Sequence, residues 1–289
     1  MIIDYASRPP APEFSKSAPH LGNYRRVYEA SEKLVFRETG EAALRDYLRT
    51  YEELGAYRVV IKARDLETTF GFKIANEDVA AFCRENEPRF VGFAGADPHK
   101  GMDALRELER AVKSLGLIGL NLQCFEHKLR ANDKKMYPLY AKCIELNIPV
   151  NIHCGLNFST RTPMSFGRPE DLDEVLTDFP ELRVCASPPG WPWCEELVAV
   201  AWRHPNVWIG LVAVRPKYLT TPDSGYGALL RYGSTVLRER IIFGSAYPMM
   251  PVARSVQELS ELPIPEDVRR QWLFDNAARF LRLAPESGA

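Results

Sequence analysis

The chain has 289 residues, of which 46% are hydrophobic and 26% are charged. This composition is typical of a globular protein and excludes an intrinsically disordered chain. The 37 basic and 38 acidic residues give a net charge of −1, so no overall positive field exists to hold a nucleic acid or an anionic membrane. We therefore expect neither as a partner. The length is close to the roughly 250 residues of a single (β/α)₈ barrel.

The N-terminal residues and the cysteines indicate the cellular compartment of the protein. The start, MIIDYASRPP, lacks the basic and apolar regions of a signal peptide, and no run of 18 apolar residues follows. The cysteines show no CxxC spacing and are expected to be buried, reduced thiols; they are Cys83, Cys124, Cys143, Cys154, Cys185 and Cys194. These features predict a cytoplasmic protein.

Eight short apolar segments have the length and composition of buried parallel strands. In chain order they are residues 2–4, 58–63, 90–96, 117–122, 149–153, 182–186, 207–212 and 241–244. Between them lie segments with the periodicity of a helix. One begins at Asn76, which we expect to be a polar cap. Another spans residues 102–115 and ends before Gly116. The alternation predicts an α/β protein with a single (β/α)₈ TIM-type barrel, formed by residues 1–289 as one domain.

In such barrels the catalytic groups come from the carboxyl ends of the strands. Polar residues follow most of the predicted strands and are candidates for the barrel mouth. They are Asp4, Arg8, Lys62, Arg64, Asn121, Gln123, His153, Ser245 and Tyr247, with Arg161 in the loop after the fifth strand.

Several motifs, in their order and spacing, resemble the amidohydrolase superfamily. They are Phe-Val-Gly-Phe-Ala at 90–94, Pro-Val-Asn-Ile-His-Cys-Gly at 149–155, Phe-Gly-Ser-Ala-Tyr-Pro at 243–248 and Asn-Ala-Ala-Arg-Phe-Leu at 276–281. The chain is similar to the amidohydrolase 2 branch, which contains aminocarboxymuconate-semialdehyde decarboxylase and resorcylate decarboxylases. The resemblance covers nearly the whole chain and implies a barrel enzyme that is a hydrolase or decarboxylase and forms a homodimer.

The resemblance also implies a metal site that this sequence has largely lost. The family's ligands are a His-x-His pair after the first strand, one His after each of the fifth and sixth, and an Asp after the eighth. The corresponding positions here are Ala6, Arg8, His153, Pro188 and Ala246. One imidazole cannot replace three or four ligands, so we expect a metal-independent protein with no cofactor. A divalent metal such as zinc, at a non-standard site built from Asp4, His153 and a cysteine, is the alternative.

Two residues are candidates for the catalytic role. Arg8 stands where a metal ligand would be, and its guanidinium could hold a substrate carboxylate in a bidentate pair. The alternative is that it pairs with a nearby acid such as Asp4. His153 could transfer a proton near neutral pH, or it could be an ordinary buried, hydrogen-bonded histidine.

The remaining candidates are assigned to substrate binding. Lys62 and Arg64 share one strand face and could bind an acid group. Lys62 could instead be a Schiff-base amine if desolvated, or a solvated loop lysine. Asn121 and Gln123 could hydrogen-bond a planar substrate. The others are Asp4, Arg161, Ser245 and Tyr247, and the polar loop at 155–167 resembles a lid.

The sequence therefore predicts an enzyme that acts on a small aromatic or unsaturated carboxylate. Hydrolysis of a lactone, ester or amide and decarboxylation both fit. Because most metal-site donors are lost, the alternative is a non-catalytic homologue that serves as a binding protein or as the partner subunit of an intact amidohydrolase.

Overall fold

A computed structural model describes residues 1–16, 18–30 and 39–283 of the chain. Within them eight parallel strands form one sheet in the order β1-β2-β5-β6-β7-β8-β9-β10. Their bounds are β1 Ile2–Ser7, β2 Ala56–Lys62, β5 Phe90–Gly95, β6 Gly119–Leu122, β7 Val150–His153, β8 Val184–Ser187, β9 Val207–Leu211 and β10 Ile241–Phe243. Each overlaps one predicted segment, so the predicted α/β barrel is confirmed.

The sheet curls until its first and last strands meet. Ser7 at the end of β1 forms a parallel bridge with Tyr247, just after β10. The amide of Arg8 donates to the Tyr247 carbonyl at 3.0 Å, and that of Ala246 donates to the Ala6 carbonyl at 2.7 Å. These bonds bring the carboxyl ends of β1 and β10 together and nearly close the barrel.

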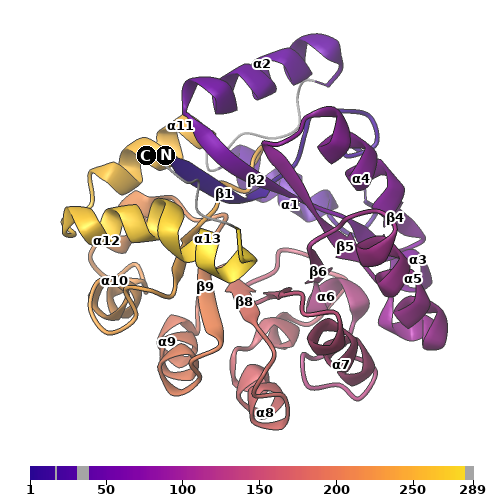
Figure 1. Cartoon of the computed structure of the whole chain (residues 1–289). Helices are drawn as coiled ribbons and strands as arrows, with labels where there is room; N and C mark the ends of the chain where they lie inside the picture. The colour runs from indigo at the N-terminus through magenta and orange to yellow at the C-terminus, as the bar shows by residue number, and fades with distance from the viewer. Residues whose placement is uncertain (17, 31–38, 284–289) are drawn as a thin grey trace.

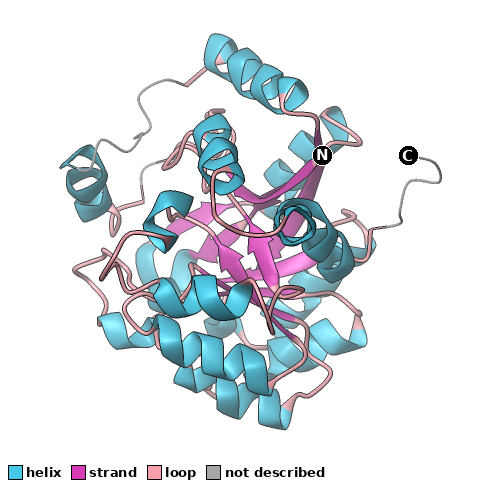
Figure 2. Ribbon diagram, turned by 90° about the vertical axis from the view of Figure 1, so that its left-hand side faces the viewer, coloured by secondary structure: helices cyan, strands magenta, loops and turns pink. Residues whose placement is uncertain are grey.

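Helices surround the strands on the outside, as Figure 2 shows. They are α1 Gly22–Ala30, α2 Glu41–Glu53, α3 Glu67–Phe70, α4 Asn76–Glu85, α5 Met102–Lys113, α6 Cys124–His127, α7 Tyr137–Glu145, α8 Glu170–Asp178, α9 Cys194–Arg203, α10 Gly227–Gly233, α11 Val252–Ser260, α12 Glu266–Arg270 and α13 Asn276–Leu281. Short 3₁₀ turns are η1 Pro98–Lys100, η2 Met164–Gly167 and η3 Pro216–Leu219, and η4 Gln271–Asp275 is a π-helical turn. A small antiparallel pair, β3 Arg64–Leu66 and β4 Phe72–Ile74, was not predicted.

The two helices singled out in the sequence are present, and one detail differs. In α5 the residues Ala104, Leu108 and Ala111 recur at helical spacing and are buried. Asn76 does not cap α4: its side chain accepts from the Gly95 amide at 2.8 Å and donates to the Gly95 carbonyl at 3.2 Å. The prediction of an Asn76 cap was wrong, because this residue ties the start of α4 to β5.

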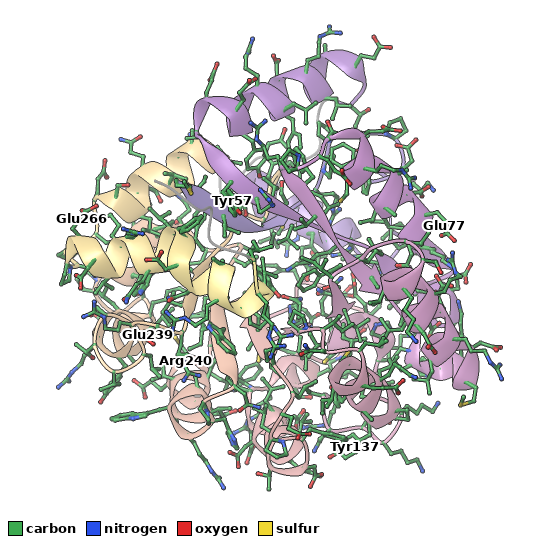
Figure 3. The ribbon with its side chains drawn as sticks, in the orientation of Figure 1. Tyr57, Glu77, Tyr137, Glu239, Arg240 and Glu266 are labelled. Carbon is green, nitrogen blue, oxygen red and sulfur yellow. The ribbon has the colours of Figure 1, made fainter. Side chains whose placement is uncertain are left out.

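The amino ends of the strands are covered by the C-terminal helices, and α13 contacts β1 and lies below it in Figure 1. Phe280 of α13 packs edge-on against Tyr5 at 5.7 Å between ring centroids and lies 5.1 Å from the Trp208 ring. Tyr57 and Arg240, labelled in Figure 3, lie at this covered end, and Arg240 lies 5.2 Å from the Trp208 ring centroid. An apolar plug therefore closes one end of the barrel and leaves the carboxyl end for a ligand.

The cysteine prediction is confirmed, since all six thiols are free and buried. Burial raises the pKa of Cys124 to about 12, which disfavours a thiolate nucleophile there. In the part of the chain that the structure describes, no helix is both long and apolar enough to cross a bilayer.

Candidate active site

Asp4 is fully buried in a network that joins β1, β10 and α2. Its carboxylate accepts from the Ser245 amide at 2.8 Å and hydroxyl at 2.5 Å, from the Tyr51 hydroxyl at 2.6 Å and from the Ala6 amide at 3.1 Å. Burial raises the pKa of Asp4, although these hydrogen bonds oppose the shift. Asp4 and Ser245, two predicted substrate-binding residues, thus use these groups to hold the barrel seam together.

A chain of amide side chains crosses the barrel interior. Asn121 donates to the Ala63 carbonyl at 3.0 Å, and its side-chain oxygen accepts from Gln123 at 3.0 Å and from Asn151 at 2.9 Å. The Asn151 oxygen accepts from the Ser187 hydroxyl at 2.7 Å. Asn121 is buried, whereas Gln123 keeps part of its surface exposed. Of the two predicted amides, Gln123 is therefore the better placed to meet a ligand.

Arg8 and Arg64 share a buried carboxylate that the sequence did not reveal. Arg64 Nη1 lies 3.4 Å from Glu126 Oε1, and the charges of Arg64 and Glu126 both act on Arg8. Burial lowers the pKa of Arg8 to about 9, with Arg64 adding to the shift and Glu126 opposing it. The oxygens of Asp4 are occupied in the seam, and the acid whose charge acts on Arg8 is Glu126.

Glu126 lies in α6, directly after β6, and is fully buried. Burial alone would raise its pKa, but Arg64, His20 and His127 together lower it to about 2. Its Oε1 is 2.8 Å from His20 Nε2, while Oε2 has no hydrogen-bond partner. Glu126 is therefore an ionised carboxylate paired with Arg64, and its charge also acts on Arg8.

His153, at the end of β7, belongs to the same cluster. Its ring lies 4.6 Å from the Phe125 ring in an edge-on contact, and its buried Nδ1 has no hydrogen-bond partner. Burial lowers the pKa of His153 to about 4, with Glu126 opposing the shift and Arg64 adding to it. The imidazole is consequently neutral at pH 7 and can accept a proton or a hydrogen bond.

The segment before and at the start of α1 covers the mouth. The His20 ring stacks on Phe70 with 4.0 Å between centroids, and Asn23 donates to the Phe158 carbonyl at 2.8 Å. Arg161 is exposed and lies 5.6 Å from the Phe70 ring centroid. Loops after β6 and β7 thus meet the N-terminal segment above the charged cluster.

A cavity of about 420 Å³ adjoins the carboxyl ends of β7, β8 and β9. Its lining is mainly apolar and aromatic and includes Leu156, Phe158, Pro188, Trp191, Val214 and Tyr218. This volume falls in the range of small-molecule sites. The lining does not include Arg8, Arg64 or His153, so the cavity and the charged cluster are separate features of the carboxyl end of the barrel.

The structure thus separates the predicted site residues into groups. Arg8, Arg64 and His153 come together around Glu126, and Lys62 lies within the barrel beside Asn151. Asp4, Asn121 and Ser245 are buried in structural networks. Tyr247 lies at the seam and packs against Tyr47 at 5.1 Å between ring centroids, while Arg161 lies at the rim. Glu126 and His20 were not predicted as site residues. Glu126 follows closely after Gln123 and could have been counted among the residues at strand ends, whereas no local pattern in the sequence marks His20.

The fold and this cluster define a barrel of the amidohydrolase type. The family model described as amidohydrolase matches residues 25–283, so the chain belongs to the amidohydrolase 2 family. The resemblance seen in the sequence is confirmed.

Individual relatives agree with this family. An uncharacterized TIM-barrel protein of Bordetella bronchiseptica is 30% identical, with a TM-score of 0.78 over 97% of this chain and 98% of that one. A 2-amino-3-carboxymuconate-6-semialdehyde decarboxylase of Dictyostelium discoideum is 27% identical over 78 residues, which are 27% of this chain and 22% of that protein. A dihydroxybenzoic acid decarboxylase of Polaromonas sp. JS666, solved with bound manganese and 2-nitroresorcinol, is 17% identical, with a TM-score of 0.67 over 98% of this chain and 97% of that one.

The last of these structures corrects the prediction about cofactors. We expected a protein without a metal, yet a barrel of the same fold holds manganese, and the prediction of no cofactor was wrong. The side chains of this chain do not fit that ion: the described residues contain no group of three or more His, Cys, Asp or Glu that could hold a metal. The alternative donors Asp4, His153 and a cysteine do not come together either. We therefore derive no chemical step through a metal.

Proposed function

We propose that the protein is a decarboxylase of small aromatic or unsaturated carboxylates. The observation that supports this most is the guanidinium of Arg64 at the barrel mouth, whose buried Nη1 has no hydrogen-bond partner among the described residues and whose charge acts on the nearby Arg8. A substrate carboxylate would accept a hydrogen bond from this nitrogen. Decarboxylase relatives of the same family point in the same direction.

In this proposal Arg64 and Arg8 bind the substrate carboxylate through charge-assisted hydrogen bonds. Arg64 Nη1 is buried without a hydrogen-bond partner, so a ligand oxygen would satisfy it. The neutral imidazole of His153 would accept a hydrogen bond from the substrate, or from a water molecule that supplies the proton to the reacting carbon. The aromatic cavity after β7 to β9 would hold the rest of the substrate.

Hydrolysis is the second candidate, favoured by the same imidazole. With a pKa of about 4, His153 is a base at pH 7 and could accept a proton from water attacking a lactone, ester or amide. The family's Asp at the end of the eighth strand is Ala246 here, so no carboxylate at that position would assist. This loss makes decarboxylation the first choice.

The test is an assay of the purified chain against a panel of small aromatic and unsaturated carboxylates and their esters. Carbon dioxide and released acid are measured separately, with and without added manganese. We expect carbon dioxide from at least one carboxylate and a KM raised about tenfold or more in Arg64→Met, because a charge-assisted hydrogen bond contributes about 1.5–3 kcal/mol. Arg106→Met, on the exposed face of α5, is the matched control.

Three results would contradict the proposal. An unchanged KM in Arg64→Met removes the assigned carboxylate site. Release of acid from esters without carbon dioxide supports hydrolysis. No turnover of any compound, together with co-purification of an intact amidohydrolase, supports the non-catalytic alternative. Homodimerisation, a single domain and a cytoplasmic location stay predictions.

A further inference from the structure

Lys62 is a buried amine that the carboxylate-binding cluster does not require. It is the last residue of β2, and its Nζ donates to Asn151 Oδ1 on β7 at 3.0 Å. Because β5 and β6 separate these two strands in the sheet, this hydrogen bond crosses the barrel interior. Nζ also lies 4.0 Å from the Tyr5 ring centroid. Both partners are neutral, and within the described residues no carboxylate forms an ion pair with it.

Burial without a carboxylate partner disfavours the ammonium form, although the face of the Tyr5 ring favours it. Burial lowers the pKa of Lys62 to about 7; the charge of Arg64 adds to this shift, while Cys185 and Asp4 oppose it. A lysine of this kind is a free amine in a large fraction of molecules at neutral pH, and a free amine is a nucleophile. Lys62 is at the carboxyl end of β2, and part of its surface is exposed.

We propose that Lys62 forms an imine with the substrate, and that the substrate carries an aldehyde or ketone β to its carboxylate, directly or through a conjugated double bond. This inference rests on the proposed function and narrows its substrate class. It assigns Lys62 as a catalytic residue, in contact with the reacting carbonyl carbon.

The chemistry balances with water and one proton. The Lys62 amine adds to the carbonyl carbon, and loss of water gives a protonated imine. The bond between the carboxyl carbon and its neighbour then breaks and carbon dioxide leaves. The electron pair of that bond forms a C=C bond to the imine carbon, and the second pair of the C=N bond moves onto nitrogen, which gives a neutral enamine. The enamine carbon takes up a proton, and water hydrolyses the imine to free Lys62 and the decarboxylated carbonyl product.

The position of Lys62 fits this sequence of steps. Arg64 is two residues further along the chain, at the start of β3, so the two residues do not share one strand face as the sequence predicted. Their Cα atoms are nevertheless no more than about 7 Å apart, and both side chains are long. A carboxylate held by Arg64 therefore places a β-carbonyl group within reach of Nζ. The hydrogen bond to Asn151 fixes the amine, and Ser187 fixes Asn151 in turn.

The experiment uses the wild-type full chain, so no variant has to fold. The protein is incubated with acetoacetate as a β-oxo carboxylate probe, reduced with borohydride and digested for mass spectrometry. We expect a reduced adduct on the peptide with Lys62 and none on Lys100, whose ammonium is held by Asp65 and Glu67. Absence of an adduct at Lys62, or equal labelling of both lysines, overturns the inference.

The variant Lys62→Arg separates this inference from the proposed function. It keeps a cation in the barrel but cannot form an imine, so we expect loss of the adduct and of turnover. If Lys62→Arg still releases carbon dioxide at the wild-type rate, the imine is overturned and the decarboxylase proposal stands. If wild-type protein gives the Lys62 adduct but releases no carbon dioxide from any carboxylate, the amine is supported and the decarboxylase proposal is overturned.

Discussion

Several charged side chains at the barrel mouth are buried, although they are not needed to stabilise the fold. Arg8, Arg64, Lys62 and Glu126 lie together where an apolar core would be more favourable. A buried ionisable group either has a partner of opposite charge or has a pKa that is shifted in favour of its neutral form. Glu126 and Lys62 show the two outcomes, because the first has cationic partners and the second has only neutral ones.

Replacing Glu126 by Gln tests the first outcome. Removing this carboxylate leaves Arg8 and Arg64 without their shared acid, so we expect the free energy of unfolding to fall by about 3 kcal/mol at pH 7. The folded-state pKa of about 2 lies below the unfolded value, so the contribution of Glu126 is complete above pH 4.5 and disappears as the pH falls from 4.5 to 2.

Urea unfolding at pH 7 and pH 3 measures this effect. The difference between wild type and Glu126→Gln should shrink at the lower pH, whereas Asp103→Asn on the exposed face of α5 should have almost no effect at either. Equal stability of wild type and Glu126→Gln at pH 7 would mean that the carboxylate does not compensate the two arginines.

Lys62→Met tests the second outcome. The folded-state pKa of about 7 lies below the unfolded value, so burial of Lys62 costs stability at neutral pH, and this cost vanishes as the pH rises towards 10.5. We expect Lys62→Met to raise Tm by about 2–4 °C at pH 7 and by less at pH 10. A lower Tm at pH 7 would show that the hydrogen bond to Asn151 outweighs the burial of the charge.

At the scale of elements, the strands were predictable and the short connections were not. Most residues of the barrel strands are apolar, because both faces of each strand are buried. The β3–β4 pair has three residues in each strand, too few for any period to be recognised. Asn76 was mistaken for a helix cap because a capping residue and a residue bonded to a distant strand have the same side chain.

The loop at 155–167 offers a test at this scale. Its ends meet where the Gly155 amide donates to the Gly167 carbonyl at 2.6 Å, and a Cβ on Gly167 would lie 2.1 Å from the Gly155 oxygen. We expect Gly167→Ala to force the loop base apart, to lower stability by about 1–3 kcal/mol and to reduce kcat/KM, because Phe158 in this loop lines the cavity.

The control for this loop variant is Gly227→Ala at the start of α10, where an added Cβ meets nothing within 4 Å. Thermal unfolding and steady-state kinetics of both variants are compared with wild type. If Gly167→Ala behaves like Gly227→Ala, the contact at the loop base does not constrain the mouth.

For the whole molecule, the order of strands and helices fixed the barrel, while the charged cluster depended on contacts between distant segments. His20 and Glu126 are 106 residues apart in the chain yet 2.8 Å apart in space. No periodicity or motif in the sequence indicates this pair, because the two residues meet only where the N-terminal segment crosses the barrel mouth. The sequence could therefore place Arg8, Arg64 and His153 at one end of the barrel but could not identify the acid between them.

The buried histidines make a prediction for the stability of the whole protein in acid. Burial lowers the pKa of both His127 and His153 to about 4. The unfolded chain protonates its histidines near pH 6.5, so between pH 6.5 and 4 it binds protons that the folded protein does not. Stability must therefore fall across this window as the pH decreases, by on the order of 3 kcal/mol for each histidine.

Urea unfolding at pH 7, 5.5 and 4.5 tests this dependence. We expect His127→Gln and His153→Gln each to flatten the fall, and the double variant to flatten it further, because Gln cannot be protonated in this range. Both side chains lie in one cluster with Glu126, so the two effects need not add exactly. If both single variants keep the wild-type dependence of stability on pH, burial does not keep either imidazole neutral. The assignment of His153 as a neutral proton acceptor at pH 7 would then be wrong.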